Sequence, residues 1–119
     1  MKRAIVGLYF CILAQNIWSS THHPQEFLAS IKGTKEEAQQ IVQHFCATCH
    51  ANHPLIPLGA PKIGSSADWQ PRLKQGMNIL FKHTNEGFGL MPARGGCFEC
   101  SDQQLLMAIQ YMLSEPSKE

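Results

Sequence analysis

The strongest restriction on how this chain folds is a C-x-x-C-H pattern, Cys46-Ala47-Thr48-Cys49-His50. Two cysteines at this spacing can form thioethers to the vinyl groups of a haem, as in c-type haem attachment. The histidine that follows can bind the haem iron as its proximal ligand. The pattern therefore predicts one covalently attached haem c, with Cys46 and Cys49 as the attachment residues and His50 on the iron.

A second C-x-x-C pair, Cys97 and Cys100, allows two other interpretations of the cysteines. The two pairs together could bind zinc, but 47 residues separate Cys49 from Cys97, against the ~15–20 typical of a zinc ribbon. A thioredoxin-like redox site needs a βαβ pattern around its cysteines, and the sequence shows none. Haem attachment is therefore favoured over zinc binding and over thiol redox chemistry.

The first 20 residues have the composition of a secretory signal peptide. Lys2 and Arg3 precede an apolar run over residues 4–14, and a more polar stretch over residues 15–20 follows. The apolar run is shorter than the roughly 20 residues that a membrane-spanning helix needs. We therefore expect cleavage at about residues 19/20, loss of Cys11 with the leader, and a periplasmic mature protein.

Chain length and charge exclude some functions. The chain has 119 residues, which is room for one domain. Removal of Lys2 and Arg3 with the leader leaves eight basic and nine acidic residues, a formal charge of −1. No basic run with interleaved aromatic residues is present, so nucleic acid is not an expected partner.

Two amphipathic helices are predicted from the spacing of apolar residues. The first begins at a capping box of Thr34 and Glu37 and leads into Cys46, and the second begins at a capping box of Ser101 and Gln104. No strand pattern occurs, so we expect an all-α fold in which these helices pack together. The apolar positions are Ala38, Ile41, Val42 and Phe45 in the first helix, and Leu105, Leu106, Ala108, Ile109, Met112 and Leu113 in the second.

Loops and short helices are predicted between these two elements. Residues 51–66 contain three prolines and two glycines, so we expect a loop, in which a carbonyl could accept the Nδ1 proton of His50. Asp68 is expected to cap a short helix through Leu73, and another short helix is expected over about 77–84. The expected organisation is a leader over 1–20, an arm over 21–33 with a helical piece near 25–31, a haem domain over 34–114 and a tail over 115–119.

Met91 is the favoured sixth ligand of the iron. It precedes Pro92 in a loop rich in glycine, whereas Met107 and Met112 lie on the last helix, where core packing is the simpler interpretation. A thioether is an established axial ligand of haem iron. The histidines outside the motif, His44, His53 and His83, are interpreted as solvated side chains.

From Cys46 to Leu113 the sequence resembles the class I cytochromes c, and within that class the bacterial cytochrome c5 group. Ser65-Ser66 and Ala93 depart from the pattern of that group, but neither departure affects an expected ligand. The matching residues are Cys46-x-x-Cys49-His50, Gly59-x-Pro61-x-x-Gly64, Trp69-x-x-Arg72, Gly76, Met91-Pro92-Ala93-Arg94-Gly95-Gly96-Cys97-x-x-Cys100-Ser101-Asp102 and Tyr111-Met112.

The resemblance implies a class I cytochrome c fold, with short helices and loops enclosing one haem. It also implies that Met91 is the sixth iron ligand, that the Pro61 carbonyl orients His50, and that Cys97 and Cys100 form a disulfide. A redox-active pair remains the alternative for these two cysteines, because a following helix N-terminus could lower a thiol pKa. Further support of the haem pocket is expected from Gly59, Ile63, Trp69 and Arg72.

The expected function is one-electron transfer between redox proteins, such as cytochrome complexes or terminal oxidases and reductases. One of these partners could be a membrane-associated redox complex. A peroxidase-like haem enzyme and a haem-based gas or redox sensor are the alternatives, and both need an open sixth position on the iron.

Two further expectations concern the surface and the N-terminus. Residues 51–96 hold five basic and two acidic side chains, whereas residues 97–119 hold one basic and four acidic, so we expect a basic face near the haem. Cleavage after Ser19 or Ser20 would leave His22 or His23 third from the new N-terminus, where a histidine can bind Cu(II) or Ni(II).

Overall fold

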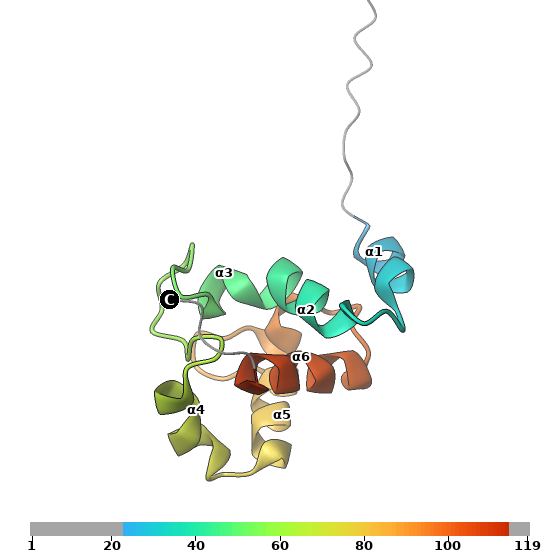
Figure 1. Cartoon of the computed structure of the whole chain (residues 1–119). Helices are drawn as coiled ribbons and strands as arrows, with labels where there is room; N and C mark the ends of the chain where they lie inside the picture. The colour runs from blue at the N-terminus through green and yellow to red at the C-terminus, as the bar shows by residue number, and fades with distance from the viewer. Residues whose placement is uncertain (1–22, 115–119) are drawn as a thin grey trace, which may run out of the picture.

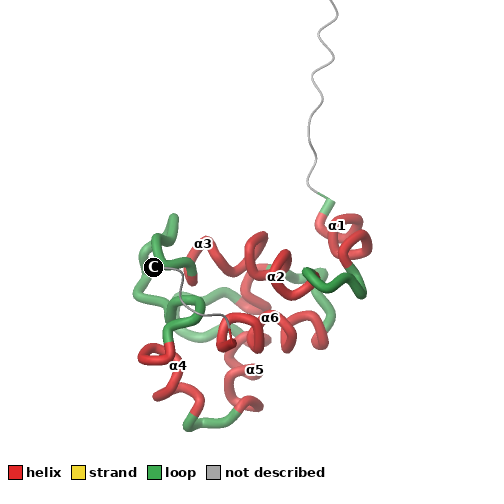
Figure 2. The backbone as a smooth tube through the Cα atoms, viewed as in Figure 1, coloured by secondary structure: helices red, strands yellow, loops and turns green. Residues whose placement is uncertain are grey.

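The computed structural model describes residues 23–114. The predicted signal peptide with Cys11, as well as His22 and the tail over 115–119, lies outside the described residues. No strand occurs within residues 23–114, where Phe88 and Met91 form one isolated bridge, and the all-α prediction is confirmed (Figure 2). The elements are α1 (Pro24–Ile31), α2 (Glu37–Ile41), η1 (Val42–Cys46), α3 (Ala47–His50), α4 (Ser66–Leu73), α5 (Met77–Glu86), η2 (Ala93–Gly96) and α6 (Asp102–Ser114).

The first predicted amphipathic helix is continuous through α2, η1 and α3, and it ends at His50 rather than at Cys46. Its middle turn, η1, is π-helical. Ile41 and Val42 are completely buried, as the apolar spacing predicted. The haem motif therefore lies on the last turns of a helix that is anchored in the core.

Helices α2 and α6 pack against each other, which confirms the predicted pairing of the first and last helices (Figure 1). Their contact forms the centre of a single cluster of buried residues. Burial of these apolar side chains stabilises the fold by about 1.5–3 kcal/mol for each large one. The cluster includes Ile41, Val42, Leu105, Ala108 and Met112 from this helix pair.

One of the two predicted capping boxes forms. Ser101 Oγ accepts a hydrogen bond from the Gln104 backbone N–H (3.1 Å), and Gln104 Oε1 accepts one from the Ser101 N–H (2.9 Å). The box predicted for Thr34 and Glu37 is wrong, because no side chain caps α2. Glu37 instead accepts hydrogen bonds from the Gly33 N–H (2.6 Å) and from Gln104 Nε2 (2.9 Å). Glu37 is buried, and a buried carboxylate must be hydrogen-bonded. Its side chain therefore pairs with these two donors instead of capping the helix.

The cap of α4 also differs from the prediction. Ser65, not Asp68, is the N-cap residue, and its Oγ accepts a hydrogen bond from the Asp68 backbone N–H (3.3 Å). Asp68 Oδ2 accepts the backbone N–H of Lys62 (3.0 Å). An extra turn therefore precedes the predicted start, and Pro71 lies inside the helix, beyond its first turn.

The arm that precedes the haem domain is folded onto it. Helix α1 agrees with the predicted helical piece within one residue, and its Leu28 and Ile31 are buried in the main core cluster. The ring of Phe27 stacks on His44 of η1, with 4.0 Å between centroids. In the structure, α1 therefore belongs to the same packed unit as the predicted haem domain (Figure 1).

Candidate functional site

A cavity of about 860 Å³ lies between α3, α4, α5 and the loops that connect them. Its volume is within the ~300–1,000 Å³ of pockets that bind small organic cofactors. Cys46, Cys49, His50 and Met91 all line it. The structure thus brings the four residues predicted to bind the haem and its iron together at one cavity.

The two motif cysteines are half-buried free thiols on consecutive turns of the helix. Burial, and then the neighbouring Cys49, raises the pKa of the Cys46 thiol to about 12. A structural zinc site would need two further ligands beside these thiols, because such sites are almost always four-coordinate. No group of three or more histidine, cysteine, aspartate or glutamate side chains that could hold a metal ion occurs among residues 23–114. The two thiols are free and line the same cavity, as attachment of one group through both requires.

His50 is oriented by the loop that follows α3. Its Nδ1 lies 2.7 Å from the carbonyl oxygen of Pro61, so a proton on Nδ1 donates to that oxygen and leaves Nε2 free to bind a metal. The backbone N–H of Ile63 donates to the His50 carbonyl (2.8 Å), which holds the same loop against the end of α3. Burial lowers the pKa of His50 despite the opposing effect of the Pro61 hydrogen bond, and the charge of Arg72 lowers it further. The imidazole is therefore neutral at pH 7, as a metal ligand must be.

Trp69 completes the support of His50. Its ring lies nearly parallel to the imidazole, and its Nε1 donates to the Lys62 backbone carbonyl (2.8 Å). The polar atom of the Trp69 ring is therefore paired with the backbone.

The other predicted pocket residues are not all at the cavity. Gly59, Pro61 and Arg72 line it, whereas Ile63 does not and packs against the main core instead. Gly59 has a φ of +72°, which a glycine adopts without penalty. Arg72 Nη1 donates to the Asp68 backbone carbonyl (2.6 Å), which keeps its guanidinium beside α4.

The Met91 loop is a tight turn held by two backbone hydrogen bonds. The Phe88 N–H donates to the Met91 carbonyl (3.1 Å), and the Met91 N–H donates to the Phe88 carbonyl (3.0 Å). A Cβ added to Gly87 would lie 3.0 Å from both the Met91 oxygen and the Ala93 nitrogen, so only glycine allows the chain to approach itself this closely. The backbone of Met91 is therefore restrained beside the cavity.

Of the three histidines interpreted as solvated, one lines the cavity. His44 stacks on Phe27, and His53 is exposed. His83 of α5 lines the cavity and stacks on Phe88, with 4.1 Å between ring centroids. His83 is thus half-buried rather than fully solvated, and the prediction that it does not bind the iron stays a prediction.

Several cavity residues were not singled out from the sequence. They are apolar side chains in proline-rich or glycine-rich loops, and some are strongly exposed, with Phe88 at 63% and Leu90 at 74%. They could have been identified from the sequence as large apolar residues in loops, where the protein has no helix to bury them. A flat apolar group such as a haem would cover them. These residues are Ile56, Leu58, Phe88 and Leu90.

Cys97 and Cys100 form a disulfide in the structure. Both residues are at least 97% buried and belong to the main core cluster. The bridge joins the end of η2 to the residue that precedes the Ser101 cap of α6. Its position is that of a structural cross-link rather than of an accessible redox pair.

Comparisons with known proteins match the stretch that builds this cavity. A protein-family model described as cytochrome c oxidase, cbb3-type, subunit III, matches residues 33–112. A cytochrome c-555 of Chlorobaculum tepidum is 42% identical over 74 residues, which are 59% of this chain and 66%, about two thirds, of that protein. A cytochrome c5 of Ectopseudomonas mendocina is 37% identical over 86 residues, which are 71% of this chain and 95% of that protein.

A solved structure, the electron transfer complex of nitrite reductase with cytochrome c, contains a chain of similar fold. It superposes with a TM-score of 0.57 at 32% sequence identity, over 65% of this chain and 90% of that one.

Proposed function

Because this chain belongs to the class I c-type cytochromes, and among them to the cytochrome c5 type, we propose that it transfers single electrons between redox proteins. Its cofactor is one covalently attached haem c. The observation that supports this function most directly is the convergence of Cys46, Cys49, His50 and Met91 on one largely apolar cavity. The haem supplies an iron that accepts and releases one electron reversibly.

We propose that His50 and Met91 would bind the haem iron. His50 offers Nε2 because Pro61 accepts the proton of Nδ1. Met91 offers a thioether, a soft ligand that favours Fe(II). The apolar lining supports this role, since exclusion of water from the iron raises the reduction potential and keeps small ligands away.

A peroxidase-like enzyme or a gas sensor is the less favoured function. Either would need an open or easily displaced sixth position and, for the enzyme, an acid–base pair beside it. His83 and Thr84 are polar side chains on the cavity wall, but His83 stacks on Phe88, and Thr84 Oγ1 donates to the Leu80 carbonyl (3.0 Å). Both are thus engaged within the protein, which favours the electron carrier.

We propose that redox partners dock over the mouth of this cavity. The exposed apolar side chains there include Leu58 and Leu90, and the exposed cations Lys62, Lys74 and Lys82 belong to the same stretch of chain. Arg94, which the sequence counted among these charges, contributes less, because its guanidinium pairs with Asp102. The solved relative in a complex with nitrite reductase supports redox proteins as the class of partner.

We place the mature protein in the periplasm, on the basis of the signal peptide expected over residues 1–20. Within residues 23–114, no helix is long and apolar enough to cross a membrane.

Haem staining and intact mass measurement test the attachment. The exported protein should gain the mass of one haem that survives denaturation, and Cys46→Ala and Cys49→Ala should each weaken that retention. Cys97→Ala is the matched control, because the Cys97 sulfur is bonded to Cys100 and does not line the cavity, and this variant should retain the haem. A mature mass equal to that of the polypeptide alone would refute the proposal.

Absorbance spectra test the carrier function itself. Oxidised and reduced protein should both be low-spin, and the oxidised form should show a weak near-infrared band from methionine-to-iron charge transfer. A high-spin spectrum would favour an enzyme or a sensor.

A further inference from the structure

Arg94 has an unusual backbone conformation three residues after Met91. Its φ is +56°, and it is the only non-glycine residue among residues 23–114 with a positive φ. This left-handed conformation is unfavourable for a non-glycine residue and persists where the surrounding contacts impose it. The side-chain contacts of Arg94 should therefore explain why an arginine occupies this position.

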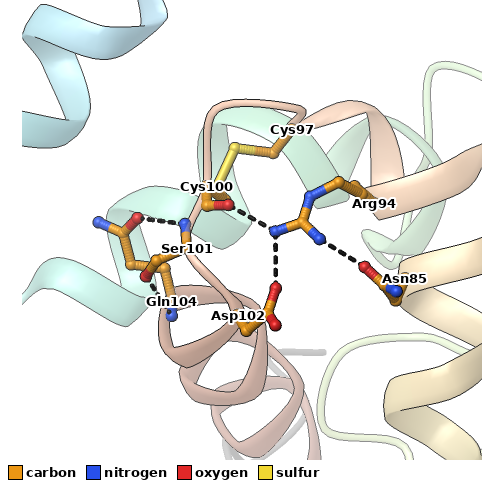
Figure 3. Close-up of polar contacts among 7 residues, drawn as sticks. All are labelled: Asn85, Arg94, Cys97, Cys100, Ser101, Asp102 and Gln104. Atoms are coloured by element: carbon orange, nitrogen blue, oxygen red, sulfur yellow. Dashed lines mark hydrogen bonds and ion pairs between the residues drawn. A yellow bond between two sulfur atoms is a disulfide. The ribbon is translucent and has the colours of Figure 1, made fainter.

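The guanidinium of Arg94 joins three parts of the structure (Figure 3). Nη1 donates to Asn85 Oδ1 near the end of α5. Nη2 donates to the Cys100 backbone carbonyl (2.6 Å) and to Asp102 Oδ1 in the first turn of α6 (3.1 Å). The side chain is only 21% exposed, and its buried Nε has no acceptor among the described residues. Only the forked geometry of arginine can reach α5 on one side and the start of α6 on the other.

The Met91 side chain lies next to the turn that contains Arg94. The residue after Arg94, Gly95, has nearly the same backbone conformation, with a φ of +58°. Both Gly95 and Met91 line the cavity, and a Cβ added to Gly95 would lie 3.6 Å from the Met91 methyl carbon, Cε. The Met91 methyl thus rests against the backbone turn that Arg94 fixes. A change in that turn would move the group that sits beside the sulfur atom.

We propose that Arg94 is a positioning residue for Met91: it fixes the turn over residues 94–95 against α5 and α6 and so holds the thioether on the iron. This proposal rests on the proposed function, in which Met91 is the sixth ligand. The mechanism is a restraint on the loop, since Arg94 itself does not line the cavity. Loss of the restraint should make the iron–sulfur bond easier to displace, even where the fold is retained.

Arg94→Gly separates the side-chain effect from the backbone effect. Glycine adopts a positive φ without penalty, so the substitution removes the contacts while it relieves the backbone. The readout is the affinity of the oxidised haem protein for added imidazole, which competes with Met91 for the iron. We expect the affinity to rise about tenfold, because at least one hydrogen bond of a charged group no longer restrains the loop. Lys35→Gln, which removes an exposed charge in the turn before α2, is the control and should bind imidazole like the unmodified protein.

Asn85→Ala provides a second test should Arg94→Gly fail to load haem. It removes one acceptor of the guanidinium from α5, and it should raise imidazole affinity in the same direction by a smaller factor. In the double variant the two effects should be less than additive, because both substitutions break the same contact.

Unchanged imidazole affinity in Arg94→Gly and Asn85→Ala would overturn the proposal, even if thermal stability fell, since a merely structural role lowers stability alone. Met91→Ala distinguishes this failure from that of the proposed function. If Met91→Ala retains the low-spin spectrum and the near-infrared band of the unmodified protein, the ligand assignment itself is wrong. If Met91→Ala loses them while Arg94→Gly behaves like the unmodified protein, only the role of Arg94 is refuted.

Discussion

The indole of Trp69 lies nearly parallel to the imidazole of His50, with 6.0 Å between the ring centroids and 14° between the ring planes. Two hydrogen bonds from α4 restrain the backbone of Lys62 beside this pair. The Lys62 carbonyl accepts a hydrogen bond from Trp69 Nε1, and the Lys62 N–H donates one to Asp68. The preceding residue, Pro61, provides the carbonyl that orients His50. Helix α4 therefore determines the direction of the imidazole through a short stretch of loop.

Trp69→Phe should keep an aromatic ring beside His50 and lose the hydrogen bond to Lys62. Leaving that carbonyl without its partner should lower the free energy of unfolding by about 1 to 3 kcal/mol. Denaturant unfolding of the haem protein measures this change. An unchanged unfolding midpoint would show that water replaces the indole N–H at no cost.

Met91→His should lower the reduction potential of the haem. Imidazole favours Fe(III) relative to a thioether, and axial ligand identity accounts for much of the ~0.8 V range of haem potentials. Redox titration followed by absorbance measures the shift. If the potential and the low-spin spectrum stayed the same in both Met91→His and Met91→Ala, another residue would have to occupy the sixth position.

Asp68 should make stability depend on pH at the acid end. The hydrogen bond from the Lys62 N–H is the main cause that lowers the pKa of this carboxyl, and the bond from Ser65 and the charges of Lys62 and Arg72 act in the same direction. The stabilisation is therefore complete above the ordinary pKa of an aspartate and is lost as the pH falls through the lower value of the folded state.

Unfolding of the unmodified protein and of Asp68→Asn should be compared across this range. The stability difference between them should be constant at neutral pH and shrink as the pH drops below about 4. A difference that stayed constant down to pH 2 would contradict the role assigned to the Asp68 carboxylate.

The Cys97–Cys100 disulfide should persist in the exported protein. Alkylation before reduction should label neither cysteine, and alkylation after reduction should label both. Removal of so short a cross-link should lower stability by roughly 2 kcal/mol in the chain-entropy model. Two thiols that label freely in the native exported protein would instead support a redox-active pair.

Local patterns in the sequence predicted the elements of this fold well. Helical spacing identified both halves of the α2–α6 contact, and the capping box of Ser101 and Gln104 forms as predicted. These features depend on neighbouring residues, so the sequence contains what determines them. The membership of Cys46, Cys49, His50 and Met91 in one site followed from the motif and from the resemblance, and all four line the cavity.

Contacts between distant residues were not predictable in the same way. Glu37 pairs with Gln104, 67 positions along the chain, so its role at the helix start could not be judged locally. Arg94 was counted as a surface charge because nothing in its neighbourhood shows that Asn85 and Cys100 will lie within reach. Ile63 looked like a pocket residue from its place in the loop, yet it packs on the core. In each case tertiary packing decides among roles that the local sequence allows equally.

The π-helical turn over Val42–Cys46 has a consequence for how the haem motif is oriented. A π turn holds one residue more than an α turn, and one α-helical residue corresponds to about 100° of rotation. Cys49 and His50 are therefore rotated by about that angle, relative to Ile41, from where a regular helix would place them. In evolutionary terms the helix has the geometry of a one-residue insertion. Deleting a single residue from it would leave the C-x-x-C-H motif intact in the sequence while its side chains turned away from the cavity.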